Sequence, residues 1–260
     1  MSIIYRRFQP GMILAGSLLI GLLLGGCGFK SRPLPLEKPL PEAPLDFSIR
    51  QLGSNAQLVW TIPEMNQDET PIRNLDGFNL YRMLFDPQDD CPDCLDRSTL
   101  LAKIDLDYPV NARVLDQRVY YFDRGVSAGR GYHYRVAART SAGREGRPAT
   151  VRLAALAPPG KPTGLTANGH DRMIRLNWEP FVPGPGDTLL GYRLYRGLAG
   201  QPIEPAPVNN EILTDTGFDD FGVENGQAYI YQVRSVIQRG ETQLESPASA
   251  VATATPQAGQ

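Results

Sequence analysis

Residues 228–236 read AYIYQVRSV and residues 131–136 read GYHYRV, so the pattern Tyr-x-Tyr-x-Val occurs twice in the chain. In both copies the large apolar residues occupy alternate positions. This spacing places one set of side chains on one face of a β-strand. Such a face packs against a second sheet to form the core of a β-sandwich. The two stretches therefore predict equivalent strands in two similar sandwiches.

The repeat extends over the residues that precede these strands. Each copy has a tryptophan closing an L-x-W triplet, an arginine closing a G-x-x-LYR stretch, and a valine six residues before the first tyrosine. In chain order the first copy supplies Trp60, Arg82, Val126 and Tyr132, and the second supplies Trp178, Arg196, Val223 and Tyr229. Self-similarity on this scale indicates two copies of one domain.

These residues resemble the fibronectin type III family, and the second copy is similar to it from PPGKPTGLTA at residues 158–167 onward. The resemblance covers residues 45–256 and implies an all-β chain of two tandem fibronectin type III (immunoglobulin-like) sandwiches. It implies one domain at 45–157 and a second at 158–256. By the same resemblance Tyr132 and Tyr229 are tyrosine-corner residues whose hydroxyls bond back to the backbone, and Trp60 and Trp178 are core residues.

The N-terminus has the composition of a bacterial secretory signal. Arg6 and Arg7 precede an apolar run at residues 11–24, and small residues then lead to Cys27. The run of fourteen residues would span about 21 Å as a helix, which is less than the roughly 30 Å of a bilayer core. The sequence therefore favours a cleaved signal at residues 1–26 over an uncleaved membrane anchor.

The tetrapeptide LGGC that ends at Cys27 resembles the lipobox of bacterial lipoproteins. The resemblance implies that the Cys27 thiol carries a diacylglyceryl group and that the new amine is acylated, for example with palmitate. Because Gly28 follows, and not aspartate, the sorting rule of Gram-negative lipoproteins implies the outer membrane. No cofactor is expected besides this covalent lipid.

Residues 27–44 contain the lipidated cysteine and a proline-rich stretch, GFKSRPLPLEKPLPEAP. Proline at this density favours extended polyproline II and removes backbone donors. We expect a semi-rigid tether between the lipid and the first domain. A docking motif for a partner groove remains the alternative.

The first copy is longer than the second between its third and sixth predicted strands. Tyr81 and Tyr132 are 51 positions apart, whereas Tyr195 and Tyr229 are 34 positions apart. The extra length includes FDPQDDCPDCLDR at residues 85–97. Long loops on rigid scaffolds often carry function.

Three chemistries compete for this insertion. With Cys27 lipidated, Cys91 and Cys94 form an even pair in an oxidising compartment, which favours a local disulfide. A redox-active CxxC lacks the surrounding βαβ pattern, and a zinc site lacks a second ligand pair. Calcium could use the aspartates, but the spacing departs from an EF-hand loop. The acidic side chains Asp89, Asp90 and Asp93 instead give a solvated loop that could contact a partner.

The composition argues against nucleic-acid binding and catalysis. Removing residues 1–26 removes two arginines and no acid, so 24 basic residues face 28 acidic ones and the net charge is near −4. Such a balance gives no electrostatic reason for a nucleic-acid partner. The chain has only two histidines, His133 and His170, and no metal or nucleophile motif. We expect a protein that is not an enzyme.

Together these features predict a lipid-anchored envelope protein that binds another protein or acts as a scaffold. The candidate contacts are the insertion and the loop between the last two strands of the first domain, with Arg139, Arg144 and Arg147. One alternative is a glycan-binding or hydrolase-accessory module, which would expose rows of aromatic residues, with Phe181 and Phe218 as candidates. The other is a redox or metal-handling lipoprotein that uses the CxxC insertion.

Overall fold

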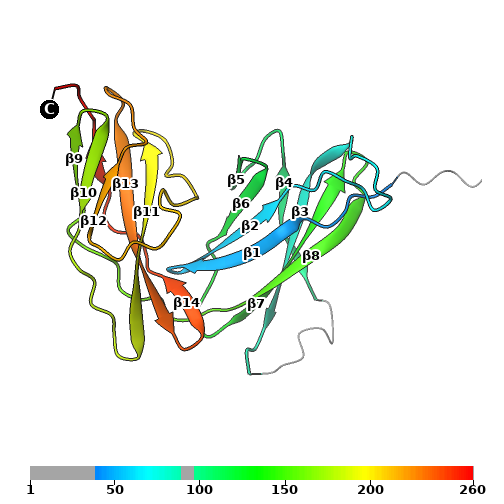
Figure 1. The fold of residues 1–260 in the computed structure, drawn as a ribbon. Helices are drawn as coiled ribbons and strands as arrows, with labels where there is room; N and C mark the ends of the chain where they lie inside the picture. The colour runs from blue at the N-terminus through cyan, green and yellow to red at the C-terminus, as the bar shows by residue number, and fades with distance from the viewer. Residues whose placement is uncertain (1–38, 89–96, 260) are drawn as a thin grey trace, which may run out of the picture. The chain divides into compact units, whose positions relative to one another are not determined.

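The computed structural model describes residues 39–88 and 97–259. Their regular elements are all β-strands (Figure 1), which confirms the predicted all-β class. No helix with the length and hydropathy to span a bilayer occurs in these residues. Pro39–Gln260 form one compact unit.

The first sandwich has two four-stranded layers. In one layer the strand order is β1-β2-β6-β5, and in the other it is β4-β3-β7-β8. The strands of the first layer are β1 (Leu45–Leu52), β2 (Asn55–Thr61), β5 (Ala112–Leu115) and β6 (Arg118–Asp123). Those of the second layer are β3 (Leu75–Phe85), β4 (Thr99–Asp105), β7 (Gly131–Thr140) and β8 (Glu145–Ala154).

The second sandwich repeats this plan with fewer strands. One layer is β12-β10-β9, and in the other β13 lies between β11 on one side and β14 and β15 on the other. The strands of the smaller layer are β9 (Thr166–His170), β10 (Met173–Asn177) and β12 (Gly217–Asp220). The other layer contains β11 (Asp187–Leu198), β13 (Tyr229–Arg239), β14 (Thr242–Glu245) and β15 (Ala252–Ala254).

Each sandwich has its own apolar core, built by the alternation seen in the sequence. In the first, Trp60 is fully buried and its ring contacts Phe47 and Phe78 edge to face, with centroids 5.8 and 5.4 Å away. In the second, the Trp178 ring meets Tyr192 at 5.4 Å. The first core lies within residues 56–155 and the second within residues 174–254. The predicted domain boundary at 157/158 falls between them.

The two sandwiches are joined through the edges of two layers. Leu52 at the end of β1 pairs in parallel with Glu245 at the end of β14, so β14 lies beside β1 (Figure 1). The backbone N–H of Gly53 donates to the Glu245 carbonyl at 2.8 Å. The other strand pairs are antiparallel. This single parallel contact extends the β5-β6-β2-β1 layer into the β14-β13-β11 layer.

Much of the extra length of the first copy forms strands. β4 and β5 lie in this part of the first copy, before β6, and β4 pairs along β3. The corresponding part of the second copy, residues 199–216, has no named strand, and instead its backbone bonds back to β11 at several points. That irregular segment lies against the first sandwich and becomes part of the candidate site.

Candidate functional site

Several predicted site residues lie outside the residues that the structure describes. They are Cys27, Cys91, Cys94, Asp89, Asp90 and Asp93. The predictions of lipidation, of a disulfide and of an acidic contact loop therefore stay predictions.

The arginines assigned to the loop between β7 and β8 lie in different places, and for Arg139 the prediction is wrong. Arg139 lies within β7, only 6 % of it is exposed, and its guanidinium pairs with Asp76. Ala138 faces the first core, so Arg139 lies on the opposite face of β7, where it is buried beside its register partner Gly77 and against Asp76 of β3. A buried and paired arginine cannot serve as a contact for a partner.

Arg144 and Arg147 remain at the surface end of this hairpin. Arg144 closes the turn, since its carbonyl accepts from the N–H of Thr140 at 2.9 Å. Arg147, in β8, has an exposed side chain whose Nη1 lies 3.5 Å from Oε2 of Glu42. Of the three arginines, these two lie where a partner could reach them.

The four predicted core aromatics are buried. Trp60 and Tyr132 belong to the first cluster, and Trp178 and Tyr229 belong to the second. The Tyr132 hydroxyl accepts from the N–H of Ser127 at 2.8 Å and donates to the carbonyl of Gly125 at 3.3 Å. The Tyr229 hydroxyl accepts from the N–H of Glu224 at 3.1 Å. Both hydroxyls thus bond to backbone five to seven residues upstream, in the manner of a tyrosine corner.

Sequence reasoning missed a buried aspartate beside each tyrosine corner. In the second sandwich, Asp220 accepts from Arg196 Nη1 at 2.8 Å, from the Tyr231 hydroxyl at 2.9 Å and from the N–H of Gly222 at 2.9 Å. The Arg196 guanidinium also lies over the Tyr229 ring, 5.6 Å from its centroid. Burial and the charge of Asp220 together raise the pKa of Tyr231.

The first sandwich contains the same cluster. Asp123 accepts from Arg82 at 2.7 Å, from the Tyr134 hydroxyl at 2.8 Å and from the N–H of Gly125 at 2.8 Å. Burial and the charge of Asp123 raise the pKa of Tyr134. The aspartates could have been found in the sequence, because each lies three residues before the repeated valine, Val126 or Val223. Their role is structural.

The surface where the sandwiches meet was not predicted. Gln57 and Tyr120 lie on the outer face of the β1-β2-β6-β5 layer, since their strand neighbours Leu58 and Tyr121 face the first core. An outer face of an antiparallel layer is normally solvated. Here Gln57 is 0 % exposed and Tyr120 is 8 % exposed. The second sandwich covers them, since Gln57 Nε2 donates to the carbonyl of Pro205 at 2.7 Å.

A polar network crosses this junction and centres on Glu245. One carboxylate oxygen of Glu245 accepts from Arg50 Nη1 at 2.9 Å, and the other accepts from the Tyr195 hydroxyl at 2.7 Å. Arg50 Nη2 also donates to Gln57 Oε1 at 2.5 Å. Arg193 Nε lies 3.4 Å from the same Glu245 carboxylate. Glu245 is only 4 % exposed, so this network is a buried link between the sandwiches.

Glu245 also affects its neighbours electrostatically. Burial and the negative charge of Glu245 raise the pKa of Tyr195. Burial lowers the pKa of Arg234, whose guanidinium lies over the Tyr195 ring, 5.7 Å from its centroid. Arg234 Nη1 donates to the carbonyl of Ser246 at 2.7 Å.

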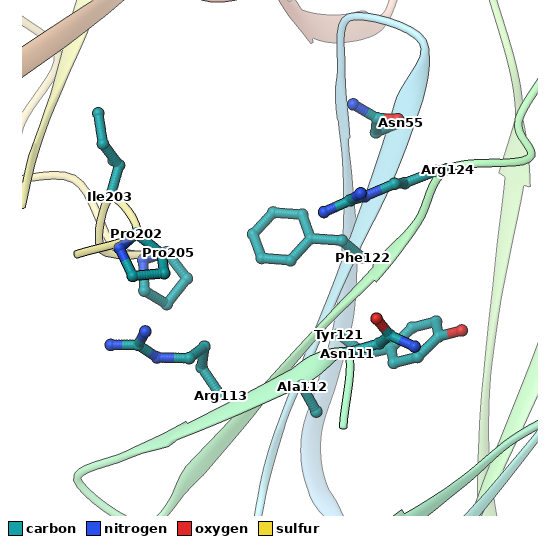
Figure 2. Close-up of a pocket in the computed structure, with 10 residues that line it drawn as sticks. All are labelled: Asn55, Asn111, Ala112, Arg113, Tyr121, Phe122, Arg124, Pro202, Ile203 and Pro205. Carbon is teal, nitrogen blue, oxygen red and sulfur yellow. The ribbon is translucent and has the colours of Figure 1, made fainter. Parts of the chain in front are cut away.

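Two pockets open on the junction, one on each side of the contact between Gln57 and Pro205. Figure 2 shows the larger, with a volume of about 600 Å³, in which Phe122 and Arg124 extend toward Pro202 and Pro205. Its remaining lining residues are Asn55, Asn111, Ala112, Arg113, Tyr121 and Ile203.

The smaller pocket, of about 260 Å³, is rich in arginine. The first sandwich contributes Ser48, Arg50, Val59, Arg118 and Tyr120, and the second contributes Arg193, Ala206 and Pro207. We call it the arginine pocket. Neither pocket exists in one sandwich alone, so the junction is the candidate functional site.

No group of three histidine, cysteine, aspartate or glutamate side chains within residues 39–88 and 97–259 could hold a metal ion. His133 lies in β7 of the first sandwich and His170 in β9 of the second, so they do not share a site. What the junction offers is guanidinium groups, aromatic faces and backbone carbonyls, which are groups for binding.

Comparisons with known proteins give partial similarities, and no family model matches the chain. Exoglucanase B of Cellulomonas fimi is 29 % identical over 148 residues, which cover 54 % of this chain and 13 % of that protein. The chain thus spans about an eighth of the length of this curated relative. A Fn3-like protein from Clostridium thermocellum is 28 % identical, covers 39 % of this chain and 95 % of its own, and has a TM-score of 0.30. The FN1-FN3 domains of chicken CNTN1 are 14 % identical, cover 84 % of this chain and 68 % of their own, and have a TM-score of 0.28.

Proposed function

We propose that this chain is a lipid-anchored, non-enzymatic protein of the bacterial envelope that binds another protein or acts as a scaffold through its fibronectin type III-like sandwiches. The observation that supports protein binding is the structure of the junction between the two sandwiches. Two sandwiches share a buried network around Glu245 and together line two surface pockets. A tandem held in this way presents a composite surface that neither sandwich has alone. Since a fold of this kind hosts many functions, the proposal rests on the site.

The anchoring part of the proposal rests on the sequence. The segment around Cys27 resembles a lipobox, and acyl chains at about 0.8 kcal/mol per buried CH₂ hold a protein stably on a membrane when two or more are present. Gly28 supports the outer membrane as its location. The prolines of residues 27–44 support a tether that keeps the sandwiches clear of the lipid surface.

The insertion and the β7–β8 turn are the secondary contacts in this proposal. Cys91 and Cys94 form a local disulfide that stiffens a loop carrying Asp89, Asp90 and Asp93. Arg144 and Arg147 offer positive charge at the β7–β8 turn.

Two experiments test the proposal in cells that express the full chain. Cys27→Ser should move the protein from the membrane fraction to the soluble fraction, and a protein that stays with the membrane would contradict lipid anchoring. Photoreactive residues at Gln88 and Ala142, next to the two secondary contacts, should give a crosslink to one abundant envelope protein, identified by mass spectrometry. If no protein crosslinks from either position or from the junction, the protein-binding function is wrong.

The similarity to Exoglucanase B favours a second candidate, an accessory module that binds a glycan. Glycan platforms use exposed aromatic rings, but Phe181 and Phe218 pack against the second core. Within the described residues the strongly exposed aromatics are Tyr108 at 80 % and Phe221 at 72 %, one in each sandwich, so they do not form a row. Co-sedimentation of the full chain with cellulose or peptidoglycan would favour this candidate over the first.

The third alternative uses the CxxC insertion for redox or metal chemistry. Counting free thiols on the native protein separates it from a structural disulfide, because a disulfide between Cys91 and Cys94 leaves neither thiol free. Replacing both cysteines by serine should then lower stability while the crosslink from Ala142 persists.

A further inference from the structure

Positive charge is in excess at the junction, although the whole chain is slightly acidic. Five arginines line the two pockets, and the carboxylates that pair with them are Glu204 and Glu245. Five positive and two negative charges leave an excess of three, whereas the chain as a whole has a net charge of −2. The lining arginines are Arg50, Arg113, Arg118, Arg124 and Arg193.

The imbalance is sharpest in the arginine pocket. Arg50 and Arg193 both depend on the single carboxylate of Glu245, at 2.9 and 3.4 Å. Within the described residues the side chain of Arg118 has no hydrogen bond or ion pair. Three guanidinium groups and one carboxylate leave two positive charges without a counter-charge in a concave site. Arg50 and Arg193 are partly buried and Arg118 is exposed, and a bound anion would supply the missing counter-charge where screening by water is reduced.

One guanidinium in the pocket also has an unused donor. Arg193 Nε is buried and makes no hydrogen bond, although it lies 3.4 Å from a carboxylate oxygen of Glu245. The side chain as a whole is about one-fifth exposed, so a ligand can reach Arg193 through the exposed part of its side chain and not through Nε. Guanidinium groups bind carboxylates through paired N–H donors, and such charge-assisted bonds are roughly twice as strong as neutral ones.

The pocket walls add backbone and aromatic surface to the arginines. Tyr120 of β6 lines the arginine pocket from the first sandwich, and Ala206 and Pro207 line it from the second. A volume of about 260 Å³ suits a carboxylate side chain and the backbone beside it, not a whole folded domain. Across the contact between Gln57 and Pro205, the pocket of Figure 2 offers Phe122 and two further arginines.

We propose that the junction binds an acidic peptide segment of a partner protein, with a carboxylate of that segment in the arginine pocket between Arg118 and Arg193. This inference rests on the proposed protein-binding function and names the site and the chemistry of the partner. The occupant follows from charge complementarity, because the pocket provides donors and positive charge but lacks the matching anion. Glu245 keeps Arg50 in place, and Arg118 and Arg193 supply the free donors.

Calorimetric titration of the full chain with two synthetic hexapeptides tests the inference. One peptide alternates glutamate and leucine, and the other has glutamine in place of glutamate. We expect the glutamate peptide to bind at least about tenfold more tightly, since a hydrogen bond to a charged group contributes more than a neutral one. Its affinity should fall as salt rises from about 50 mM to about 500 mM, because screening weakens partly exposed charge pairs.

Arg118→Gln is the decisive variant, with Arg130→Gln as its matched control. Arg118 has no partner to lose, so its replacement should leave the unfolding midpoint unchanged and weaken the glutamate peptide by about fivefold or more. Arg130 is an exposed arginine in the turn before β7, outside both pockets, and its replacement should leave the affinity unchanged.

Three results with the peptides would overturn the inference. They are equal binding of the two peptides, no binding of either, and an Arg118→Gln variant that binds as the unaltered chain does. Inorganic phosphate that binds in an Arg118-dependent way, with no binding of the glutamate peptide, would also overturn it, since the pocket would then select a small free anion. None of these results changes the crosslinking from Gln88 and Ala142, so a failure of the inference is distinguishable from a failure of the protein-binding function.

Discussion

Replacing Asp220 by asparagine removes one charge from the second sandwich and changes almost nothing in side-chain size. Asp220 is 4 % exposed and accepts hydrogen bonds from Arg196, Tyr231 and Gly222. An asparagine keeps one acceptor oxygen, but its NH₂ group replaces the other. That NH₂ group is a donor and would face donors of Arg196, Tyr231 or Gly222. The Arg196 guanidinium then loses its counter-charge.

The expected loss follows from that geometry. Removing one partner of a buried ion pair costs about 3–5 kcal/mol. The Arg196 side chain is about one-quarter exposed, so water replaces part of the lost interaction and the lower end of this range applies. We therefore expect a loss of about 3 kcal/mol in the free energy of unfolding. At roughly 2–4 °C per kcal/mol for a unit of this size, the midpoint should fall by about 6–12 °C.

The neighbouring residue supplies the control. Asp219 pairs with Arg175 on the surface, with both side chains more than one-third exposed. Asp219→Asn should cost no more than about 1 kcal/mol. Thermal unfolding followed by circular dichroism, with the fluorescence of Trp60 and Trp178 reporting the two cores, measures both variants. If Asp220→Asn destabilises the protein no more than Asp219→Asn does, the buried cluster does not stabilise the sandwich and the reasoning is refuted.

Three further predictions concern the fold and the junction. Burial and a neighbouring carboxylate raise the pKa of Tyr231, so the folded state keeps this phenol protonated above pH 10, where the unfolded chain ionises it. The free energy of unfolding should therefore fall above about pH 10, by at most about 1.4 kcal/mol per pH unit for this group. Urea unfolding measured at several pH values should show a shallower fall for Tyr231→Phe than for the unaltered chain. Gly77→Ala should lower the unfolding midpoint because a Cβ at this position would overlap the carbonyl oxygen of Ile104 in β4. Gly184→Ala is the control and should not lower it, since no neighbour lies closer than 3.9 Å to its Cβ. Equal midpoints for the two variants would contradict the packing described for β3 and β4. Glu245→Gln should broaden the distance distribution between two nitroxide labels, one in each sandwich, measured by pulsed electron paramagnetic resonance. Glu145→Gln is the control. It alters a similar tyrosine–glutamate bond inside the first sandwich and should leave the distribution unchanged.

The alternation and the repeat were enough to predict the all-β class and two sandwiches, because a strand's buried face is a local property of its sequence. Tyr134 and Tyr231, for example, occupy matching positions in the two copies and are fully buried. The hydroxyl partners Asp123 and Asp220 were not predicted, because an aspartate at the end of a strand is normally expected to be solvated. Only the comparison of the two copies, in which Asp123 and Asp220 align, carries the signal.

The junction could not be predicted from either copy by itself. Leu52 and Glu245 are 193 positions apart, and no local pattern in β1 or β14 indicates that they pair. Gln57 and Tyr120 alternate with core residues, so their sequence positions predict exposure, and only contact with the second sandwich buries them. The prediction for Arg139 failed for the related reason that its contacts with Asp76 and Gly77 of β3 bury it on the outer face of β7.

A photoreactive residue at Ala206, on the wall of the arginine pocket, tests the proposed binding site most directly. In living cells that express the full chain, it should crosslink to one envelope protein at an acidic segment, located by mass spectrometry of the crosslinked peptide. The crosslink should be lost when Arg118→Gln is added and kept when Arg130→Gln is added. No protein crosslink from position 206, or one that Arg118→Gln leaves unchanged, would contradict a partner site at the junction.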